Sequence, residues 1–196
     1  MAKVFSTIDA DLADWIAQQR MFFVSTAPNA AEGLLNRSPT GLDSLRVLDE
    51  RTVAYLDLTG SGNETVAHLK ENGRIVVMMC AFEGAPRILR IHGIGEVFEK
   101  GSAEYSKLVD QFPDYLGARS IIRIAVERIA DSCGWGVPLY AYHGERDALQ
   151  KWADKKGDAG ITEYQQTTNA RSIDGLRGLA PGTCESGDAS RESPSS

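Results

Sequence analysis

Residues 53–82, VAYLDLTGSGNETVAHLKENGRIVVMMCAF, contain the pattern that decides the fold. The segment 52–58 is rich in β-branched, aromatic and leucine side chains and predicts a strand. The glycine-rich stretch TGSGN then leads into a helix, which should end at Asn72-Gly73, a pair suited to a left-handed C-terminus. The apolar run 75–82 predicts a second strand, covered on both faces. We therefore expect strand, glycine-rich turn, helix and buried strand.

The sequence on either side of this stretch predicts more short strands and few helices. We expect strands at 21–27, 34–38, 45–48, 87–99 and 121–130. Residues 121–130, IIRIAVERIA, suit a strand by their isoleucines and a helix by their charge spacing; we favour the strand because glycines and a proline follow. Six or seven strands at hairpin spacing, with too little strand–helix alternation for a parallel sheet, predict an antiparallel barrel that is mainly β with flanking helices.

Three helices complete the predicted domain. The first should begin after a Thr7 cap, the second after a Ser102 cap, and the last should contain Trp152. At 196 residues and 21.3 kDa the chain fits one domain, which we place at residues 1–180. Residues 181–196 consist of Ser, Gly, Pro and charged residues with no apolar face, and we expect a disordered tail there.

Composition excludes several function classes. The formal net charge is -6, so we expect no nucleic-acid partner and no anionic membrane surface as partner. No apolar stretch approaches the roughly 20 residues of a membrane span, and the N-terminus has no apolar signal core. The three cysteines are far apart, which argues against a disulfide framework or a CxxC site. These features predict a cytoplasmic protein.

The first candidate site is the glycine-rich segment 59–65, TGSGNET, between a strand and a helix. Such a junction offers unpaired backbone N–H groups, the helix dipole and the hydroxyls of Ser61 and Thr65, all suited to a phosphate. The segment is neither a Walker A loop nor a GxGxxG dinucleotide motif, because the lysine and the glycine spacing are absent. A capped helix start with a tight turn would explain the same residues.

Two further segments are candidates. The stretch 36–43, NRSPTGLD, is polar and kinked, and its proline and glycine should fix a bend whose amides and small side chains face a cavity. A plain surface loop is the alternative. In DSCGWGVP, residues 131–138, Trp135 lies between glycines and is able to cover a flat ring or to anchor a partner subunit. A core tryptophan at a strand end is the alternative reading.

Other chemistries have less support. The histidines at 68, 92 and 143 are isolated, with no HxxxH or HExxH spacing, so we expect no metal site. Cys80 lies in an apolar strand and is interpreted as a core thiol. The sequence contains no GxSxG motif, so nothing in it supports an α/β-hydrolase.

The order of these motifs resembles a known family. NRSPTG, the quoted stretch 53–82, PRILRIHGIGEV and SCGWGVP together resemble the pyridoxamine 5'-phosphate oxidase-like, FMN-binding split-barrel family, in its uncharacterised branch. The resemblance covers about residues 5–180, including NARSIDGLRGL at 169–179. It implies a split β-barrel and a homodimer with two FMN molecules in grooves between the subunits.

The resemblance also assigns site residues. The phosphate should lie near Ser61, Gly62, Asn63 and Thr65, and the ring and ribityl chain beside Ser38, Pro39 and Thr40. Three more candidates are Arg90 near the ring edge, Trp135 at the dimer interface or pocket wall, and Arg37. Related sequences commonly have lysine where this chain has Thr40, and basic residues at Asn63 and Thr65. Hydroxyls, amides and an arginine from elsewhere must then hold the phosphate.

Three functions remain open at this point. The first is a flavin-dependent oxidoreductase acting on a small molecule, with an electron donor such as NADH or NADPH, in which flavin supplies the chemistry because no residue stands out as a general acid or base. The second is a non-catalytic flavin-binding or sensing protein. The third replaces FMN by a deazaflavin coenzyme or by haem, and the histidines offer no evident haem ligand. Pyridoxal phosphate motifs of the true oxidases are not evident.

Overall fold

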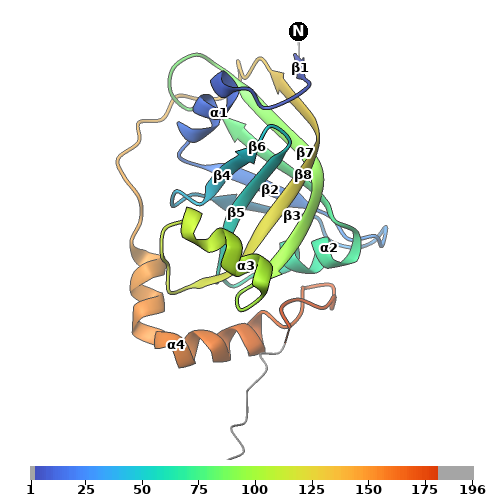
Figure 1. Cartoon of the computed structure of the whole chain (residues 1–196), viewed down its shortest axis with the longest axis vertical. Helices are drawn as coiled ribbons and strands as arrows, with labels where there is room; N and C mark the ends of the chain where they lie inside the picture. The colour runs from blue at the N-terminus through green and yellow to red at the C-terminus, as the bar shows by residue number, and fades with distance from the viewer. Residues whose placement is uncertain (1–2, 181–196) are drawn as a thin grey trace, which may run out of the picture.

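The structure is a computed structural model that describes residues 3–180, a curved sheet with helices around it (Figure 1). The strands are β1 (Val4–Phe5), β2 (Phe22–Thr26), β3 (Asn36–Thr40), β4 (Leu45–Asp49), β5 (Thr52–Leu58), β6 (Arg74–Cys80), β7 (Ile88–Glu99) and β8 (Ala118–Ser132). The helices are α1 (Ala10–Ala17), α2 (Glu64–Asn72), α3 (Ala103–Leu108) and α4 (Ala148–Thr168), with a 3-10 turn η1 (Val109–Gln111). The tail predicted at 181–196 lies outside the described residues.

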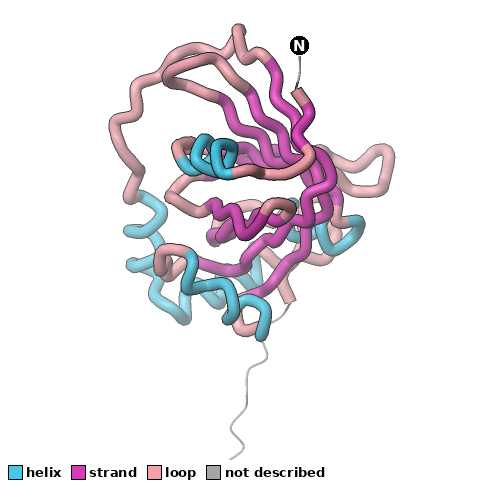
Figure 2. Tube along the Cα trace, turned by 45° about the horizontal axis from the view of Figure 1, so that its top comes forward, coloured by secondary structure: helices cyan, strands magenta, loops and turns pink. Residues whose placement is uncertain are grey.

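All strand pairs are antiparallel, in the order β3-β2-β6-β7-β8-β5-β4, and β1 pairs with β8. β3 and β4 stand at opposite ends of this order, yet only residues 41–44 separate them in the chain. The sheet therefore curls until its ends approach each other, as Figure 2 shows, and the barrel is split between β3 and β4. The prediction of a split barrel is confirmed, with eight strands among residues 3–180 instead of six or seven. The additional β1 has two residues, too few for a periodic pattern.

The barrel interior holds the main hydrophobic core. Val24, Val77, Ile91 and Ile124 are buried there, and α1 closes one end with Leu12 and other apolar side chains. Burying each side chain of this size stabilises the fold by about 1.5–3 kcal/mol. A second buried cluster lies where α3 and η1 cover β5 and β8.

The long strand β8 settles the ambiguity at residues 121–130. It pairs with β5 on one side and with β7 on the other, so the strand is confirmed. Ile122, Ile124 and Ile129 join the barrel core from one face, and Ile121 joins the second cluster from the other. β7 has a bulge at His92/Gly93, where a Cβ on Gly93 would stand 2.2 Å from the carbonyl oxygen of Ala125.

Helix termini follow the expected chemistry with one correction. Ser102 Oγ accepts a hydrogen bond from the Tyr105 N–H at 3.1 Å, and Gly73 ends α2 in the left-handed conformation at φ 72°. The prediction of a Thr7 cap for α1 is wrong. Asp9 is the cap, accepting from the Leu12 N–H at 2.9 Å, because a carboxylate two residues further along serves the same orphan donors.

The NRSPTG segment also needs a correction. We expected β3 at 34–38, followed by a bend, but the strand covers Asn36–Thr40 and the turn comes at 41–44. Pro39 is tolerated because β3 is an edge strand, paired on one side only with β2. Ser38 and Thr40 therefore share one face of a regular strand.

The C-terminal part of the described chain wraps around the barrel. A loop, residues 133–147, runs along one side of the molecule and leads into α4, which contains Trp152 as expected and is broken at Gly157 (Figure 1). After α4 the chain turns back toward α2, and we call residues 169–180 the C-terminal segment. This segment contacts the glycine-rich loop.

Candidate functional site

The glycine-rich loop between β5 and α2 opens onto a cavity of about 370 Å³, which we call the loop cavity. The cavity brings together seven of the predicted residues, Ser38, Pro39, Thr40, Ser61, Gly62, Asn63 and Thr65. The first three come from β3 and the others from the loop and the start of α2. Motifs more than 20 residues apart in sequence thus meet at one place, as the resemblance implied.

The start of α2 offers main-chain donors to this cavity. Asn63 is the cap residue, but its side chain makes no capping hydrogen bond. The first N–H groups of a helix have no intrahelical acceptor, and the helix dipole places partial positive charge there. Together with the hydroxyls of Ser38, Thr40 and Ser61, these amides make the cavity rich in donors.

Asn36 connects the two walls of the loop cavity. Its Nδ2 donates to Thr65 Oγ1 at 2.8 Å, and its Oδ1 accepts from Ser38 Oγ at 3.2 Å. β3 and α2 are therefore cross-linked by one amide. The Thr65 hydroxyl, predicted as a phosphate ligand, is already part of this network.

A buried ion pair lies under the loop. Arg119 binds Asp57 through two hydrogen bonds, Nε to Oδ2 at 2.7 Å and Nη2 to Oδ1 at 3.1 Å, and Ser120 Oγ also donates to Asp57 at 2.8 Å. Arg119 Nη1 holds the loop by donating to the Gly62 carbonyl at 3.0 Å. Burial opposes the charged guanidinium, but the charge and hydrogen bonds of Asp57, with smaller contributions from Tyr55 and Glu64, together raise the pKa of Arg119. Arg119 therefore lines the cavity with its charge balanced by Asp57 and with one N–H group holding the loop.

The C-terminal segment closes the loop from the other side through Asn169, which is fully buried. Its Nδ2 donates to the Gly60 carbonyl at 3.0 Å, and its Oδ1 accepts from Arg119 Nη1 at 2.8 Å. The Asn63 side-chain amide donates to the Asn169 carbonyl. Asn63 Oδ1 is buried and has no partner among the described residues. The loop is thus held between β8 and the C-terminal segment.

Three predicted site residues do not line the loop cavity. Arg37 stacks over Phe23 at 5.0 Å, and Arg90 donates from Nη1 to Ser132 Oγ at 2.9 Å. Arg37 lies on the alternate face of β3 from Ser38, by the period of two along a strand. Trp135 is 84% exposed on the 133–147 loop, so it is not a core tryptophan. All three are placed away from Ser61 and its neighbours.

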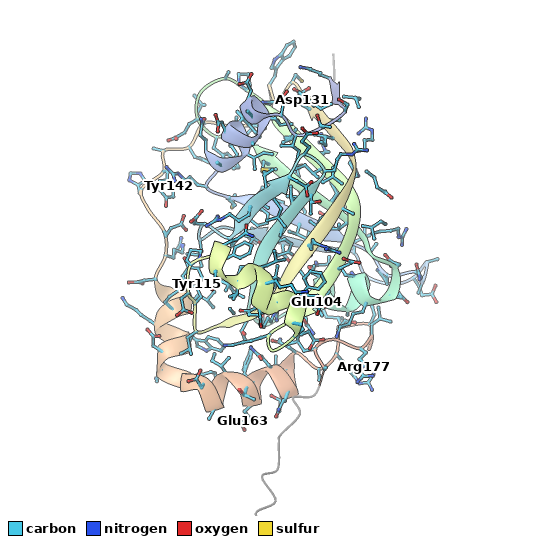
Figure 3. All side chains as sticks on the ribbon, viewed as in Figure 1. Glu104, Tyr115, Asp131, Tyr142, Glu163 and Arg177 are labelled. Carbon is cyan, nitrogen blue, oxygen red and sulfur yellow. The ribbon has the colours of Figure 1, made fainter. Side chains whose placement is uncertain are left out.

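A larger cavity of about 620 Å³, which we call the aromatic cavity, adjoins the first. The two share Gly41 and Leu42 of the β3–β4 turn, part of β3 and Leu149. Its wall includes Phe82 stacked on Tyr140 at 5.4 Å, and Tyr142, which lies on the long loop in Figure 3. Tyr142 donates its hydroxyl to Glu145 at 2.8 Å. Flat side chains of this kind suit a planar ring.

Sequence reasoning assigned no role to Asp57, Arg119 or Asn169, and it included Asn36 only as part of the candidate stretch 36–43. Asp57 carried a signal, since a carboxylate inside the apolar strand VAYLDL requires a buried partner. The partner, Arg119, is 62 residues away, and no local pattern identifies it. Asn169 belongs to the closing NARSIDGLRGL stretch, but its role depends on the fold.

The Cys80 thiol and the His, Asp and Glu side chains of residues 3–180 bear on other chemistries. Cys80 is buried, and burial raises the pKa of its thiol, as expected for a core cysteine. In this part of the chain no cluster of three or more His, Cys, Asp and Glu side chains is arranged to bind a metal ion. None of the helices described combines the length and apolar character needed to cross a membrane.

Comparisons with known proteins agree with this architecture. The family model described as pyridoxamine 5'-phosphate oxidase matches residues 8–133. The pyridoxamine 5'-phosphate oxidase family protein ustO of Aspergillus flavus is 38% identical over 192 residues, covering 89% of this chain and 77% of the fungal protein. A crystal structure of a HupZ variant from Group A Streptococcus has a TM-score of 0.50 and 25% identity, covering 64% of this chain and 99% of that chain.

A second solved structure supports the fold alone. It is a Lactobacillus delbrueckii protein named as a candidate pyridoxamine 5'-phosphate oxidase, with a TM-score of 0.50 and 16% identity, covering 65% of this chain and 98% of that chain. The fold and the loop cavity define a split-barrel protein with a glycine-rich loop at a strand–helix junction. The chain belongs to the pyridoxamine 5'-phosphate oxidase family.

Proposed function

We propose that this protein binds FMN across the loop cavity and the aromatic cavity and acts, as a cytoplasmic homodimer, as a flavin-dependent oxidoreductase on a small molecule. The observation that carries the proposal is the shared boundary at Gly41 and Leu42, which joins a donor-rich cavity to an aromatic one. FMN has the same two-part character, a phosphate and a flat ring. Membership of the family supports the flavin further.

The residues of the loop cavity fit a phosphate and a ribityl chain. Ser61 and the first amides of α2 supply donors, which phosphate oxygens require. Asn63 Oδ1, buried without a partner among the described residues, is an acceptor suited to a ribityl hydroxyl. The Ser38 and Thr40 hydroxyls would lie between these two groups.

Bound flavin would supply the electron and hydride chemistry. The protein's own groups would then bind and orient the flavin and its substrate. In the loop cavity Asp57 is paired with Arg119, Glu64 accepts from the Ile173 N–H at 3.2 Å, and burial followed by the charge of Asp57 raises the pKa of Tyr55 well above its ordinary value. Tyr55 therefore holds its proton, Asp57 and Glu64 are engaged in hydrogen bonds, and the Phe82–Tyr140 stack offers a flat surface to the ring.

A second copy of the chain would complete the site. Large apolar side chains on the 133–147 loop are exposed, among them Trp135 and Leu139 at 84% and 74%. An exposed group of this kind favours contact with another protein. We propose that the loop, with Arg37 and Arg90, lies at or near the homodimer interface. Sedimentation equilibrium should give twice the monomer mass; a monomer at all concentrations would contradict this.

The test of the proposed cofactor is an absorbance spectrum of freshly purified protein, with mass spectrometry of what heat releases. We expect a flavin spectrum and FMN at one molecule per chain. Addition of NADH or NADPH should bleach the flavin faster than it bleaches free FMN. A protein that takes up no flavin from excess FMN would overturn the proposal.

Thr40→Lys is expected to tighten FMN binding about tenfold, because the only cation among the described residues that line the loop cavity, Arg119, is already neutralised. Riboflavin has no phosphate and should bind both proteins within about twofold. Fluorescence titration with both ligands measures the difference. Thr40→Met is the matched control for side-chain length. Equal gains for FMN and riboflavin would place the phosphate elsewhere.

A non-catalytic flavin protein is the second candidate, favoured by the absence of an unpaired acid or base in the described wall of the loop cavity. It predicts stoichiometric FMN with no donor oxidised faster than by free FMN. A deazaflavin coenzyme in place of FMN would be identified by parallel titrations of the protein with both compounds.

A further inference from the structure

A histidine with no role so far, His68, lies buried behind the loop cavity. It is on α2, is 0% exposed, and its Nδ1 lies 2.9 Å from Thr26 Oγ1. Its Nε2 is buried and has no partner among the described residues. A fully buried imidazole with one ring nitrogen unpaired destabilises the fold relative to an apolar side chain at the same position.

A chain of side-chain hydrogen bonds connects His68 to the cavity. Thr26 Oγ1 accepts from Asn36 Nδ2 at 3.3 Å, and the same Nδ2 donates to Thr65 Oγ1 at 2.8 Å. Asn36 Oδ1 accepts from Ser38 Oγ at 3.2 Å. Ser38 and Thr65 line the cavity, so the chain reaches from a titratable group to the proposed ligand.

Donor and acceptor rules give this chain a direction. Both Nδ2 protons of Asn36 are used, one on Thr26 and one on Thr65. Thr26 Oγ1 has a second lone pair, so the direction of its bond to His68 is set by the tautomer of the ring. In neutral His68 with its proton on Nε2, the single hydroxyl proton of Thr26 points to Nδ1, which accepts it. Protonated His68 can only donate from Nδ1, so Thr26 would have to accept from it and turn its own hydroxyl proton away, which disturbs the oxygen that Asn36 contacts.

The charges around His68 do not hold it in the cationic form. Burial lowers its pKa, and Asp174, Glu64 and Glu71 oppose this only partly. Two of these carboxylates lie on α2 and the third on the C-terminal segment, and from β2 the neighbour is the neutral Thr26. The carboxylates also serve others: Glu71 accepts from the Asn29 N–H at 2.7 Å and Asp174 from the Leu34 N–H at 2.9 Å. His68 is neutral at neutral pH.

We propose that neutral His68 is a positioning residue, which holds the Ser38–Asn36–Thr65 wall of the loop cavity in its binding arrangement through the hydroxyl of Thr26. Its consequence for affinity rests on the proposed function, because flavin is taken as the ligand of this wall. The folded-state pKa of His68 is lowered, so its contribution is present at neutral pH and is lost as pH falls below the ordinary histidine range. Affinity should fall with pH in the same direction.

Three variants separate positioning from packing. His68→Asn keeps an acceptor near the place of Nδ1 but does not titrate, and His68→Leu keeps apolar volume without the acceptor. Thr26→Val removes the hydroxyl between His68 and Asn36. His92→Asn is the matched control, because His92 lies half-buried on β7, outside this network.

The first measurement uses the protein without ligand. In an NMR titration from about pH 8 to about pH 5, the Asn36 side-chain amide should shift with the same midpoint as the His68 imidazole. His68→Asn and Thr26→Val should abolish this shift, and His92→Asn should keep it. An Asn36 amide that does not follow His68 overturns the proposal, whatever the ligand is.

The second measurement is riboflavin affinity against pH, with riboflavin chosen because it has no phosphate to titrate. Wild type should weaken about tenfold from pH ~7.5 to pH ~5.5, and His68→Asn should stay within about twofold. His68→Leu should bind about tenfold more weakly at both values. If the riboflavin affinity of His68→Asn depends on pH as that of wild type does, the proposal is contradicted. If Asn36 follows His68 but no flavin binds, the positioning network stands and the flavin assignment fails.

Discussion

Arg119→Met should destabilise the fold more than any other single polar substitution at the site. It leaves the buried Asp57 carboxylate without its cation and removes the donors to the Gly62 carbonyl and to Asn169 Oδ1. Removing one partner of a buried pair costs about 3–5 kcal/mol. For a domain of this size the unfolding midpoint should fall on the order of 10 °C. Differential scanning calorimetry measures both quantities.

The same strand provides the control for Arg119. Arg123 forms an ion pair with Glu96 on the surface of β7 and β8, so Arg123→Met should change stability by about 0–1 kcal/mol. The double variant Asp57→Leu/Arg119→Met should recover part of the loss, because no buried charge is left unpaired. A single Arg119→Met variant as stable as Arg123→Met would show that the pair does not hold the loop.

The local parts of this fold could be predicted because their causes are local. The strand–glycine–helix–strand order of residues 53–82 and the left-handed end at Gly73 follow from side-chain shape and backbone freedom. The strand at 121–130 was ambiguous because a bulge inserts Glu127 opposite His92/Gly93, so Glu127 and Arg128 are both exposed and the two-residue alternation is broken. β1 pairs only two residues with β8, and nothing in its own sequence marks it.

Several residues that line the loop cavity were predicted from the sequence, but the buried residues that hold them in place were not. Ser61 and Thr65 were found from the rule that helix starts bind anions, and Ser38 and Thr40 from the family resemblance. The clamp of Arg119 and Asn169 joins residues 50 positions apart, and such pairings are specified by the tertiary fold. Arg37 was predicted as a site residue because it precedes Ser38 in the sequence. Side chains alternate along β3, however, so Arg37 lies on the opposite face from Ser38.

The C-terminal segment makes a second prediction of large effect, which concerns binding more than folding. A Cβ on Gly178 would stand 1.9 Å from Asn63 Nδ2 and 2.4 Å from the Asn169 carbonyl oxygen. Both atoms belong to the contact that closes the glycine-rich loop, so Gly178→Ala should push the segment off the loop. Overpacking of this kind costs about 1–3 kcal/mol, which corresponds to roughly 5–150-fold in FMN affinity.

The main structure of the barrel should survive Gly178→Ala, because the segment lies outside the sheet and contributes only Leu179 to the main core. We expect unchanged far-UV circular dichroism, faster amide exchange in the loop at residues 60–63, and weaker FMN binding by fluorescence titration. Gly136→Ala is the matched control, since a Cβ there meets no atom within 4 Å. If Gly178→Ala binds FMN as tightly as Gly136→Ala does, the C-terminal segment does not hold the loop in its binding form.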